Sequence, residues 1–590
     1  MTAYLRAWTR RDYTTMAKLV DQPSAPLASS DRKFVSDLGV RSVEHVAGTL
    51  TQTKDRATVP LTNRYVIATF GAFSTRGVLT LRRTNGHWLV VWSPQQVATA
   101  LRAADRVATT LTWPTRAPIL GAAGTPLTTV ATVVTVGVQG SRIKDRAQLI
   151  SVLEQSGAPP GAVTGALATA AAHPQWFVRV FDLGERDYAR LKPTIYPIGG
   201  TVFRTHTARA AITSELAAHV VGGVGPITAE QLGKLGPPHA ATDFVGRSGI
   251  EAAYESRLAG RPGGRVEVLN PAGNRTATLA TFPARPGTPV RTTIEPAVQR
   301  AAEHALAAVP GDAALVAVRA STGAVIATVS NPSSKGFDIA LDGQFPPGST
   351  FKVVTSADLL EHGFTPASTT SCPPTITIDG RVFHNFEGEA IGSLTLEQAF
   401  AQSCNAVFIG LSTRLPYASF ASTAARFGLG ERLHLGVDAF GGSVPNPTTP
   451  VERAATAIGQ ARVVVSPLAM AVAAATVDSG SLRVPRLVAG TPGDTAPPKP
   501  LDPKVVGGLR TMMAAVVANG TGAGRGLPAG TFGKTGTAEF GAANPPATHA
   551  WFIGYRGDIA FAVLVVGGGV GGRVAAPIAA TFLGGLGATR

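Results

Sequence analysis

Three short motifs, far apart but in a fixed order, constrain this chain more than its composition does. They are Ser349-Thr-Phe-Lys352, Ser403-Cys-Asn405 and Lys534-Thr-Gly-Thr537. Each motif is a weak signal alone, because a chain of 590 residues should contain a Ser-x-x-Lys pattern by chance. The ordered set is a strong signal, and it predicts a fold that brings the three segments to one site.

The first motif pairs a candidate nucleophile with a candidate base. Ser349 and Lys352 are three residues apart, so their side chains share one face if Ser349 opens a helix. A serine hydroxyl becomes a nucleophile when a base takes its proton, and a buried lysine with a lowered pKa can be that base. The free backbone N–H groups of a helix N-terminus can stabilise an oxyanion. The alternative is a common four-residue pattern on a solvated helix.

The two other motifs follow predicted secondary structure. Residues 394–402 resemble a helix that leads into Ser403, and Thr531-Phe532 with the residues after Gly533 predict a strand that carries the third motif. Within that strand, Gly536 would let the backbone of a ligand approach closely.

Ser-x-x-Lys, Ser-x-Asn and Lys-Thr-Gly in this order resemble the signature of penicillin-binding proteins and the related serine β-lactamases. Two further segments resemble class B penicillin-binding proteins. Residues 113–127 are similar to the opening of their pedestal, or dimerisation, domain, and residues 246–260 match its Gly-x-Ser-Gly-hydrophobic-Glu segment. For Glu251 in that segment, the resemblance implies a structural contact at a domain junction; the alternative is a carboxylate on a helix surface.

The resemblance implies a multidomain α+β protein, in keeping with the three to four domains expected at this length. We expect a small cone-shaped α+β domain at residues 1–112 and an elongated pedestal domain at residues 113–286. Residues 287–590 should form a penicillin-binding transpeptidase domain, an antiparallel sheet flanked by helices as in serine β-lactamases.

Residues 1–112 show helical spacing at both 4–20 and 34–38, followed by alternating strand-like runs. Asn85-Gly86 predicts a hairpin between the last two strands. This order is similar to the nuclear transport factor two-like domain at the start of methicillin-resistance-type penicillin-binding proteins. It contains no catalytic set, so we expect a spacer or a regulatory binding module.

The resemblance implies acyl transfer. Ser349 would attack the carbonyl of a D-alanyl-D-alanine bond, expel the last D-alanine and form an acyl-enzyme, with Lys352 as base. Ser403 would relay a proton to the leaving amine, and Lys534 would polarise the proton network. Asn405 would hold the peptide carbonyl of the substrate and orient Lys352.

Substrate recognition is implied for the rest of the third motif. Lys534, Thr535 and Thr537 suit a terminal carboxylate, and the backbone N–H groups of Ser349 and Thr537 would form the oxyanion hole. The amine of a neighbouring stem peptide would then take the acyl group and complete a cross-link. A β-lactam antibiotic would acylate Ser349 and leave slowly.

The formal net charge of +16 favours a polyanionic envelope or an anionic membrane surface as surroundings. Nucleic acid is not expected, because no basic-aromatic stripe or DNA-binding motif occurs. The chain begins without a signal peptide and has no apolar run of 18 residues. We expect a monomer that works with other cell-wall synthesis proteins at the outer face of the cytoplasmic membrane, with its anchor or signal missing from this chain.

No cofactor is expected, because His384, His434 and His549 do not fall at metal-ligand spacing. The two cysteines, Cys372 and Cys404, leave two interpretations open. They could form a disulfide in an oxidising compartment, or they could be two small buried thiols.

Several other functions share parts of this signature. A serine β-lactamase or β-lactam sensor has the three motifs, but the extra glutamate of class A enzymes cannot be assigned here. A D,D-carboxypeptidase would transfer the acyl group to water, and a non-catalytic scaffold would need decayed motifs. No segment before Ser349 looks like a glycosyltransferase, which favours a monofunctional class B transpeptidase. A role in elongation, division or antibiotic resistance is left open.

Overall fold

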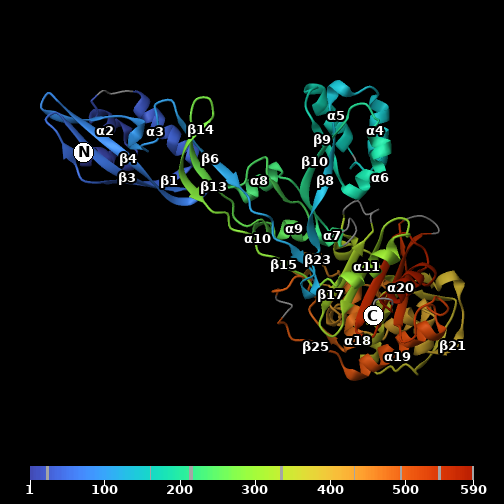
Figure 1. Cartoon of the computed structure of the whole chain (residues 1–590). Coiled ribbons are helices and arrows are strands. Elements are labelled where there is room, and N and C mark those ends of the chain that lie inside the picture. The colour runs from blue at the N-terminus through green and yellow to red at the C-terminus, as the bar shows by residue number, and fades with distance from the viewer. Residues whose placement is uncertain are drawn as a thin grey trace. The chain divides into compact units, whose positions relative to one another are not determined.

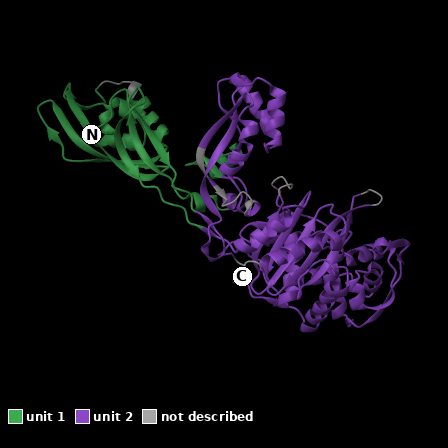
Figure 2. Cartoon of the chain, turned by 45° about the vertical axis from the view of Figure 1, so that its right-hand side comes forward, with its two compact units in different colours: residues 1–117, 225–245, 254–289 green, residues 118–224, 246–253, 290–590 purple. Residues whose placement is uncertain are grey.

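The structure is a computed structural model that describes residues 1–21, 25–159, 161–211, 217–331, 337–430, 432–491, 495–541 and 546–587. The chain forms two compact units (Figure 2). Unit 1 holds residues 1–117, 225–245 and 254–289, and unit 2 holds residues 118–224, 246–253 and 290–590. The segment expected to form the pedestal, residues 113–286, therefore contributes to both units.

Unit 1 begins with three helices, α1 (Thr2–Thr9), α2 (Tyr13–Lys18) and α3 (Ala25–Leu38), followed by an antiparallel sheet (Figure 1). The sheet has the order β1 (Val40–Ala47), β3 (Arg56–Ile67), β4 (Gly71–Thr84) and β5 (His87–Val91), with β2 (Thr51–Gln52) beside β3. In β3, exposed and buried residues alternate strictly, so one face meets the core and the other meets solvent. The expected hairpin at Asn85-Gly86 is confirmed between β4 and β5, and both residues have positive φ. The helix expected at residues 34–38 is longer and begins at Ala25.

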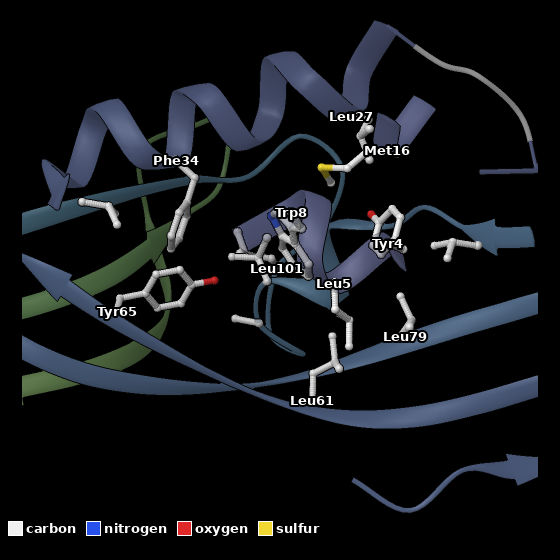
Figure 3. Packing of buried hydrophobic residues seen from close by; sticks show 14 of the residues in the cluster. Tyr4, Leu5, Trp8, Met16, Leu27, Phe34, Leu61, Tyr65, Leu79 and Leu101 are labelled. Carbon is white, nitrogen blue, oxygen red and sulfur yellow. The ribbon is translucent and has the colours of Figure 1, made fainter. Parts of the chain in front are cut away.

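Aromatic side chains fill the core of unit 1. Figure 3 shows Trp8, Phe34 and Tyr65 between the helices and the sheet, and the rings of Phe34 and Tyr65 lie 5.1 Å apart. The indole of Trp8 donates to buried Asp31 at 2.9 Å, and the hydroxyl of Tyr13 donates to the same carboxylate at 2.8 Å. The carboxylate is therefore satisfied inside an apolar core.

A later part of the chain completes this core. Strand β13 (Gly263–Leu269) pairs with β6 (Arg106–Thr112) and with β14 (Arg275–Phe282) in a three-stranded sheet. Val266 and Val268 of β13 belong to the same buried cluster as Trp8. Unit 1 is thus built from segments more than 150 residues apart.

One part of unit 2 is a three-stranded sheet with helices. Strand β8 (Thr128–Val138) lies between β10 (Thr201–Ala211) and β9 (Val178–Gly184), and the helices are α4 (Arg146–Gln155), α5 (Ala162–Ala172) and α6 (Glu185–Ile195). Glu251, on α9 (Gly249–Ala253), is buried and forms an ion pair with Arg209 of β10. Glu251 is therefore not a carboxylate on a helix surface; the expected contact at a domain junction stays a prediction, because this ion pair lies within unit 2.

The larger part of unit 2 is a five-stranded antiparallel sheet between helices. Its order is β17 (Ala324–Ser330), β16 (Ala313–Arg319), β28 (Ile559–Val565), β27 (Ala547–Arg556) and β26 (Phe532–Phe540). Helices α11 (Pro296–Leu306) and α20 (Gly571–Gly587) share one buried cluster with alternate residues of these strands. Helix α18 (Pro467–Ser479) contacts β16, β27 and β28, where the remaining residues are also buried. Helices therefore cover both faces, and β26 is an edge strand.

The first two motifs lie where two helices begin. Ser349 lies in a 3₁₀ turn, η5 (Gly348–Phe351), and α13 (Lys352–Glu361) begins only at Lys352. The helix expected at residues 394–402 is shorter, because β21 (Gly392–Thr395) precedes α14 (Leu396–Ala401) and Thr395 caps that helix. Helix α15 (Asn405–Ser412) follows the second motif directly. None of the described helices combines the length and hydropathy needed to cross a bilayer.

Candidate active site

The turn that carries Ser349 packs tightly against the third motif. Gly348 has φ +53°, and a Cβ there would come within 2.7 Å of the Thr537 carbonyl oxygen. The N–H of Gly348 donates to the carbonyl of Gly459 at 3.0 Å, and the indole N–H of Trp551 donates to the carbonyl of Pro346 at 3.0 Å. Ser349 is half-buried, and these contacts to the residues before it hold its turn beside β26.

Lys352 is fully buried and meets the second motif. Its Nζ donates to the Asn405 side-chain oxygen at 2.8 Å, to the Ser403 carbonyl at 2.6 Å and to the Ser403 hydroxyl at 3.3 Å. Burial holds the pKa of Lys352 well below its usual value, and the nearby charge of Lys534 lowers it further, while Glu389 opposes both. A neutral amine in this position can accept a proton from a hydroxyl.

Ser403 holds a strained backbone conformation at the start of the second motif. Its φ is +63°, in the left-handed region that non-glycine residues seldom adopt. Such a conformation persists where surrounding contacts enforce it. Here the Ser403 N–H donates to the Phe400 carbonyl at 3.1 Å, and the next residue, Cys404, forms a disulfide with Cys372. The left-handed turn directs both the carbonyl and the hydroxyl of Ser403 at Lys352.

Lys534 of β26 is the second buried amine of the site. Its Nζ donates to the Thr535 carbonyl at 3.1 Å and lies 5.4 Å from the centre of the Phe400 ring. Burial lowers the pKa of Lys534 to about 7. The charge of Lys534 also disfavours the charged form of Lys352, which lies close to it.

Gly536 is required by packing within the protein. A Cβ at this position would lie 2.7 Å from the Thr350 methyl group and 2.9 Å from the Trp551 Cβ. Gly536 therefore allows the Ser349 turn and the third motif to approach each other. Both neighbouring threonines are also bonded: the Thr535 hydroxyl lies 2.6 Å from that of Thr521, and the Thr537 hydroxyl accepts from the Gly571 N–H at 3.3 Å.

The free edge of β26 presents backbone groups of alternate residues. The side-chain amide of Gln460 pairs with the backbone of Glu539, accepting from its N–H at 3.0 Å and donating to its carbonyl at 3.3 Å. Since β27 lies on the other side of β26, the backbone groups of Glu539 point to the free edge. By the two-residue period of a strand, those of Thr535 and Thr537 point the same way. This edge can therefore pair with an extended peptide.

The structure brings Ser403, Asn405, Lys352 and Lys534 together, and the turn of Ser349 packs on the strand of Thr535–Thr537. The sequence assigned no role to Gln460 or Thr521, since neither lies in a motif. Of the three histidines considered above, His434 is exposed beside Asp438 and His549 stacks on Phe540. His384 is exposed, and it meets the site through its backbone carbonyl, which accepts from the Asn405 side chain. In the described part of the chain, no three His, Cys, Asp or Glu side chains are grouped as metal ligands.

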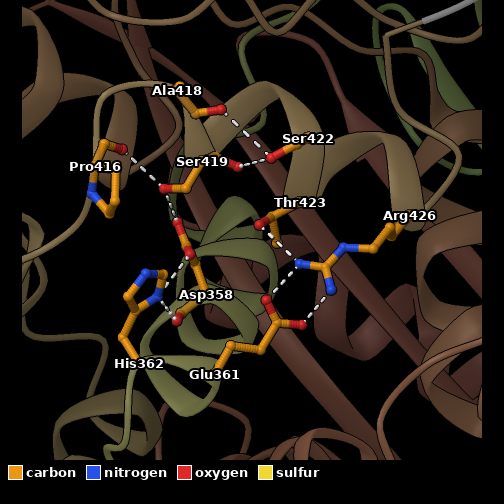
Figure 4. A network of polar contacts seen from close by, with 9 residues as sticks. All are labelled: Asp358, Glu361, His362, Pro416, Ala418, Ser419, Ser422, Thr423 and Arg426. Atoms are coloured by element: carbon orange, nitrogen blue, oxygen red, sulfur yellow. Dashed lines mark hydrogen bonds and ion pairs between the residues drawn. The ribbon is translucent and has the colours of Figure 1, made fainter.

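A polar network at the far end of α13 anchors the helix that carries Lys352 (Figure 4). Ser419 of α16 (Ser419–Arg426) donates to buried Asp358, and His362 contacts the same carboxylate at 3.2 Å. Arg426 forms an ion pair with Glu361. Because the serine donates to the carboxylate and not to the histidine, this trio is no catalytic triad, and it ties α13 to α16.

Two family models match this chain. The model of the penicillin-binding protein transpeptidase domain matches residues 313–584, and that of the penicillin-binding protein dimerisation domain matches residues 112–292. The peptidoglycan D,D-transpeptidase PbpA of Mycobacterium tuberculosis is 32% identical over 378 residues, which are 52% of this chain and 74% of PbpA. The peptidoglycan D,D-transpeptidase MrdA of Acinetobacter baumannii is 26% identical over 464 residues, 67% of this chain and 68% of MrdA.

Solved structures share the fold. A structure of a complex between penicillin-binding protein PBP2 and MreC from Helicobacter pylori contains a chain that aligns with a TM-score of 0.62 at 20% identity, over 82% of this chain and 99% of that chain. A chain from a study of polymerization and crosslinking by a peptidoglycan synthase complex aligns with a TM-score of 0.60 at 26% identity, over 82% of this chain and 92% of that chain.

Proposed function

The chain belongs to the class B penicillin-binding proteins, which are peptidoglycan D,D-transpeptidases, and from this premise we propose that Ser349 is the nucleophile of its cross-linking reaction. The donor is a stem peptide that ends in D-alanyl-D-alanine. Its terminal carboxylate binds at Lys534, Thr535 and Thr537, and its backbone adds to the free edge of β26.

Acylation begins with proton transfer from the Ser349 hydroxyl to the neutral amine of Lys352. The Ser349 oxygen attacks the peptide carbonyl, and the backbone N–H groups of Ser349 and Thr537 stabilise the oxyanion. When the tetrahedral intermediate collapses, the C–N bond breaks and the Ser349 ester remains. The departing D-alanine amine receives the proton of Lys352 through the Ser403 hydroxyl, which lies 3.3 Å from Nζ.

Transfer repeats these steps with a new nucleophile. An amine of a second stem peptide attacks the ester carbonyl and loses its proton to the Lys352 and Ser403 relay. The ester C–O bond then breaks, the acyl group passes to the amine, and Lys352 returns the proton to the Ser349 oxygen. Asn405 keeps its side-chain oxygen on Lys352 and positions the peptide carbonyl of the donor. A β-lactam enters by the same acylation step and leaves slowly.

The observation that carries this proposal is the burial of Lys352 with its three contacts to Ser403 and Asn405. Such an amine is deprotonated more easily than an exposed lysine and is placed to exchange protons with hydroxyl groups. A scaffold would have no use for two fully buried lysines, since burying an unused amine destabilises the fold. The alternatives are a D,D-carboxypeptidase and a β-lactam hydrolase or sensor.

A transfer assay tests the proposal. The protein is incubated with a donor peptide ending in D-alanyl-D-alanine and with an acceptor amine, and the products are resolved by mass. We expect D-alanine release and a cross-linked product, both absent from a Ser349→Ala variant. Release of D-alanine without any cross-linked product would instead show a carboxypeptidase.

We propose surroundings and partners from the relatives. The similar H. pylori chain was solved with MreC and another in a peptidoglycan synthase complex, so we propose that this chain works with cell-wall synthesis proteins at the outer face of the cytoplasmic membrane. We propose that residues 1–112 are a nuclear transport factor two-like spacer or binding module, because three helices there precede an antiparallel sheet.

A further inference from the structure

Residues 372–389 lie between the first two motifs in the sequence and contact the second motif in the fold. We call them the clamp segment. At its centre, Asn385 is 4% exposed. Its side-chain nitrogen donates to the Pro373 carbonyl at 2.7 Å and to the Glu389 carbonyl at 2.6 Å. Its side-chain oxygen accepts from the N–H of Ala406 at 2.9 Å. Asn385 therefore closes the clamp segment on itself and fastens it to the second motif.

The bond to Ala406 has a specific role at the start of α15. The first N–H groups of a helix have no partner within it, and a side chain at the N-cap usually accepts from one of them. The N-cap of α15 is Cys404, which makes no such hydrogen bond. Asn385 supplies the missing acceptor from 21 residues earlier in the chain. The helix that begins with Asn405 is thus capped by the clamp segment.

The clamp segment also orients the amide of Asn405. The side-chain nitrogen of Asn405 donates to the carbonyl of His384 at 3.2 Å, which leaves the side-chain oxygen directed at the Nζ of Lys352 at 2.8 Å. If the amide turned over, its nitrogen would face the amine and its oxygen would face a carbonyl. The position of the His384 carbonyl, next to Asn385, therefore selects the orientation that accepts from Lys352.

The left-handed turn at Ser403 needs such external support. Its φ of +63° lies in the left-handed region, which is unfavourable for a residue with a Cβ. The flanking Cys404 is bonded to Cys372 at one end of the clamp segment, and Ala406 is bonded to Asn385 at its centre. Two independent links therefore hold the turn on either side of Asn405.

We propose that Asn385 is a positioning residue of the transpeptidase reaction, which acts through the amide of Asn405 on the base Lys352. The inference rests on the proposed function of Ser349. Without the Asn385 side chain, the hydrogen bonds that position the His384 carbonyl and the first turn of α15 are lost. The side-chain oxygen of Asn405 then no longer keeps its hydrogen bond with Lys352. The acylation step then slows, although every residue of the three motifs is present.

The test compares Asn385→Ala with a matched control, Asn331→Ala. Asn331 is also 4% exposed and also bonds backbone groups, donating to the Val309 and Gly311 carbonyls and accepting from the Ala313 N–H. It lies just after β17, at the opposite edge of the sheet from β26. Both variants lose one buried amide, but only one of them lies beside the second motif.

The measurement is the second-order rate constant for acylation by a fluorescent penicillin, followed from pH 5 to pH 9 on the whole chain. We expect Asn385→Ala to be acylated at least ten times more slowly than the parent, and Asn331→Ala within twofold of it. The side-chain oxygen of Asn405 stabilises the ammonium form of Lys352, so its loss lowers the pKa of Lys352. The acid limb of the Asn385→Ala profile should therefore move to lower pH.

Two results would overturn the inference. One is an Asn385→Ala protein that is acylated within twofold of the parent; the other is a slower variant whose acid limb does not move. If Asn385→Ala does not fold, Asn385→Asp takes its place. The aspartate keeps an acceptor for the N–H of Ala406 but loses both donated hydrogen bonds. This variant should still be acylated several-fold more slowly than the parent, and an unchanged rate would refute the inference. A parent that is not acylated at all would refute the proposed function of Ser349 instead.

Discussion

At the scale of single residues, the two buried lysines determine how the site responds to pH. Both are fully buried, and each lies over an aromatic ring, Lys352 over Phe408 and Lys534 over Phe400. Burial penalises the charged form of each amine, and the charge of one penalises that of the other. The proposed base and the proposed carboxylate-binding cation are therefore neighbouring amines whose pKa values both lie below the usual value.

This arrangement predicts a bell-shaped pH profile for acylation by benzylpenicillin. The rate rises as Lys352 loses its proton and falls above about pH 7 as Lys534 loses the charge that attracts the carboxylate. A Lys534→Arg variant stays charged at every accessible pH, so the fall above pH 7 should disappear. Stopped-flow rates between pH 5 and pH 9 check this, and a parent profile that stays level up to pH 9 would contradict it.

Gly348 is a residue of the Ser349 turn whose position leaves no room for a side chain. A Cβ there would meet the Thr537 carbonyl at 2.7 Å, and the φ of +53° already disfavours any other residue. We expect Gly348→Ala to lower the free energy of unfolding by about 2–4 kcal/mol, the sum of backbone strain and overpacking. It should also slow acylation at least tenfold, since Ser349 is displaced.

Gly363→Ala is the matched control for this prediction. Gly363 also has a positive φ, +92°, but a Cβ there would meet nothing within 4 Å. The control should lose only about 1–2 kcal/mol of unfolding free energy and keep its acylation rate. Chemical denaturation and acylation of both variants check the pair; equal losses of stability and equal rates would show that the contact with Thr537 is unimportant.

At the scale of elements, the disulfide joins the end of β18 (Thr369–Cys372) to the N-cap of α15. It closes a loop of about 32 residues that contains the clamp segment and α14. By the loop-closure model, its removal should lower the free energy of unfolding by about 2–4 kcal/mol. We expect Cys372→Ser to unfold at lower temperature than the parent under oxidising conditions.

Reduction provides the check on this prediction. A reducing agent should lower the melting temperature of the parent toward that of Cys372→Ser and leave the melting temperature of the variant unchanged. If the parent melts at the same temperature with and without the reducing agent, the disulfide does not stabilise the protein.

Some helices, strands and turns could be predicted from the sequence, and others could not. The strands of residues 1–112, the strand of the third motif and the Asn85-Gly86 hairpin were predictable, because alternation and turn chemistry are local. Two features near the site were not: the 3₁₀ turn at Ser349 is imposed by packing on Thr537 and Gly459, and the cap of α15 comes from Asn385, 21 residues earlier. Local signals cannot report a partner that the fold brings from another segment.

At the scale of the whole molecule, compact unit 1 is built from three separate stretches of the chain. Residues 225–245 and 254–289 return to unit 1, where Val266 and Val268 pack in the cluster of Trp8. The later segment joins unit 1 because β13 pairs with β6, and the two strands are separated by 150 residues. No shift in composition marks this segment in the sequence. The three motifs could be recognised because their chemistry is specific, whereas local signals do not report that β13 pairs with β6.

If Ser349 forms a slowly hydrolysed acyl-enzyme, the intact mass of the protein after incubation with benzylpenicillin will show it. We expect one adduct of the mass of the drug on the parent chain, stable for many minutes and absent from Ser349→Ala. Turnover of several drug molecules per second would show a β-lactamase. An adduct that persists in Ser349→Ala, or none on a folded parent at high drug concentration, would contradict the assignment of the nucleophile.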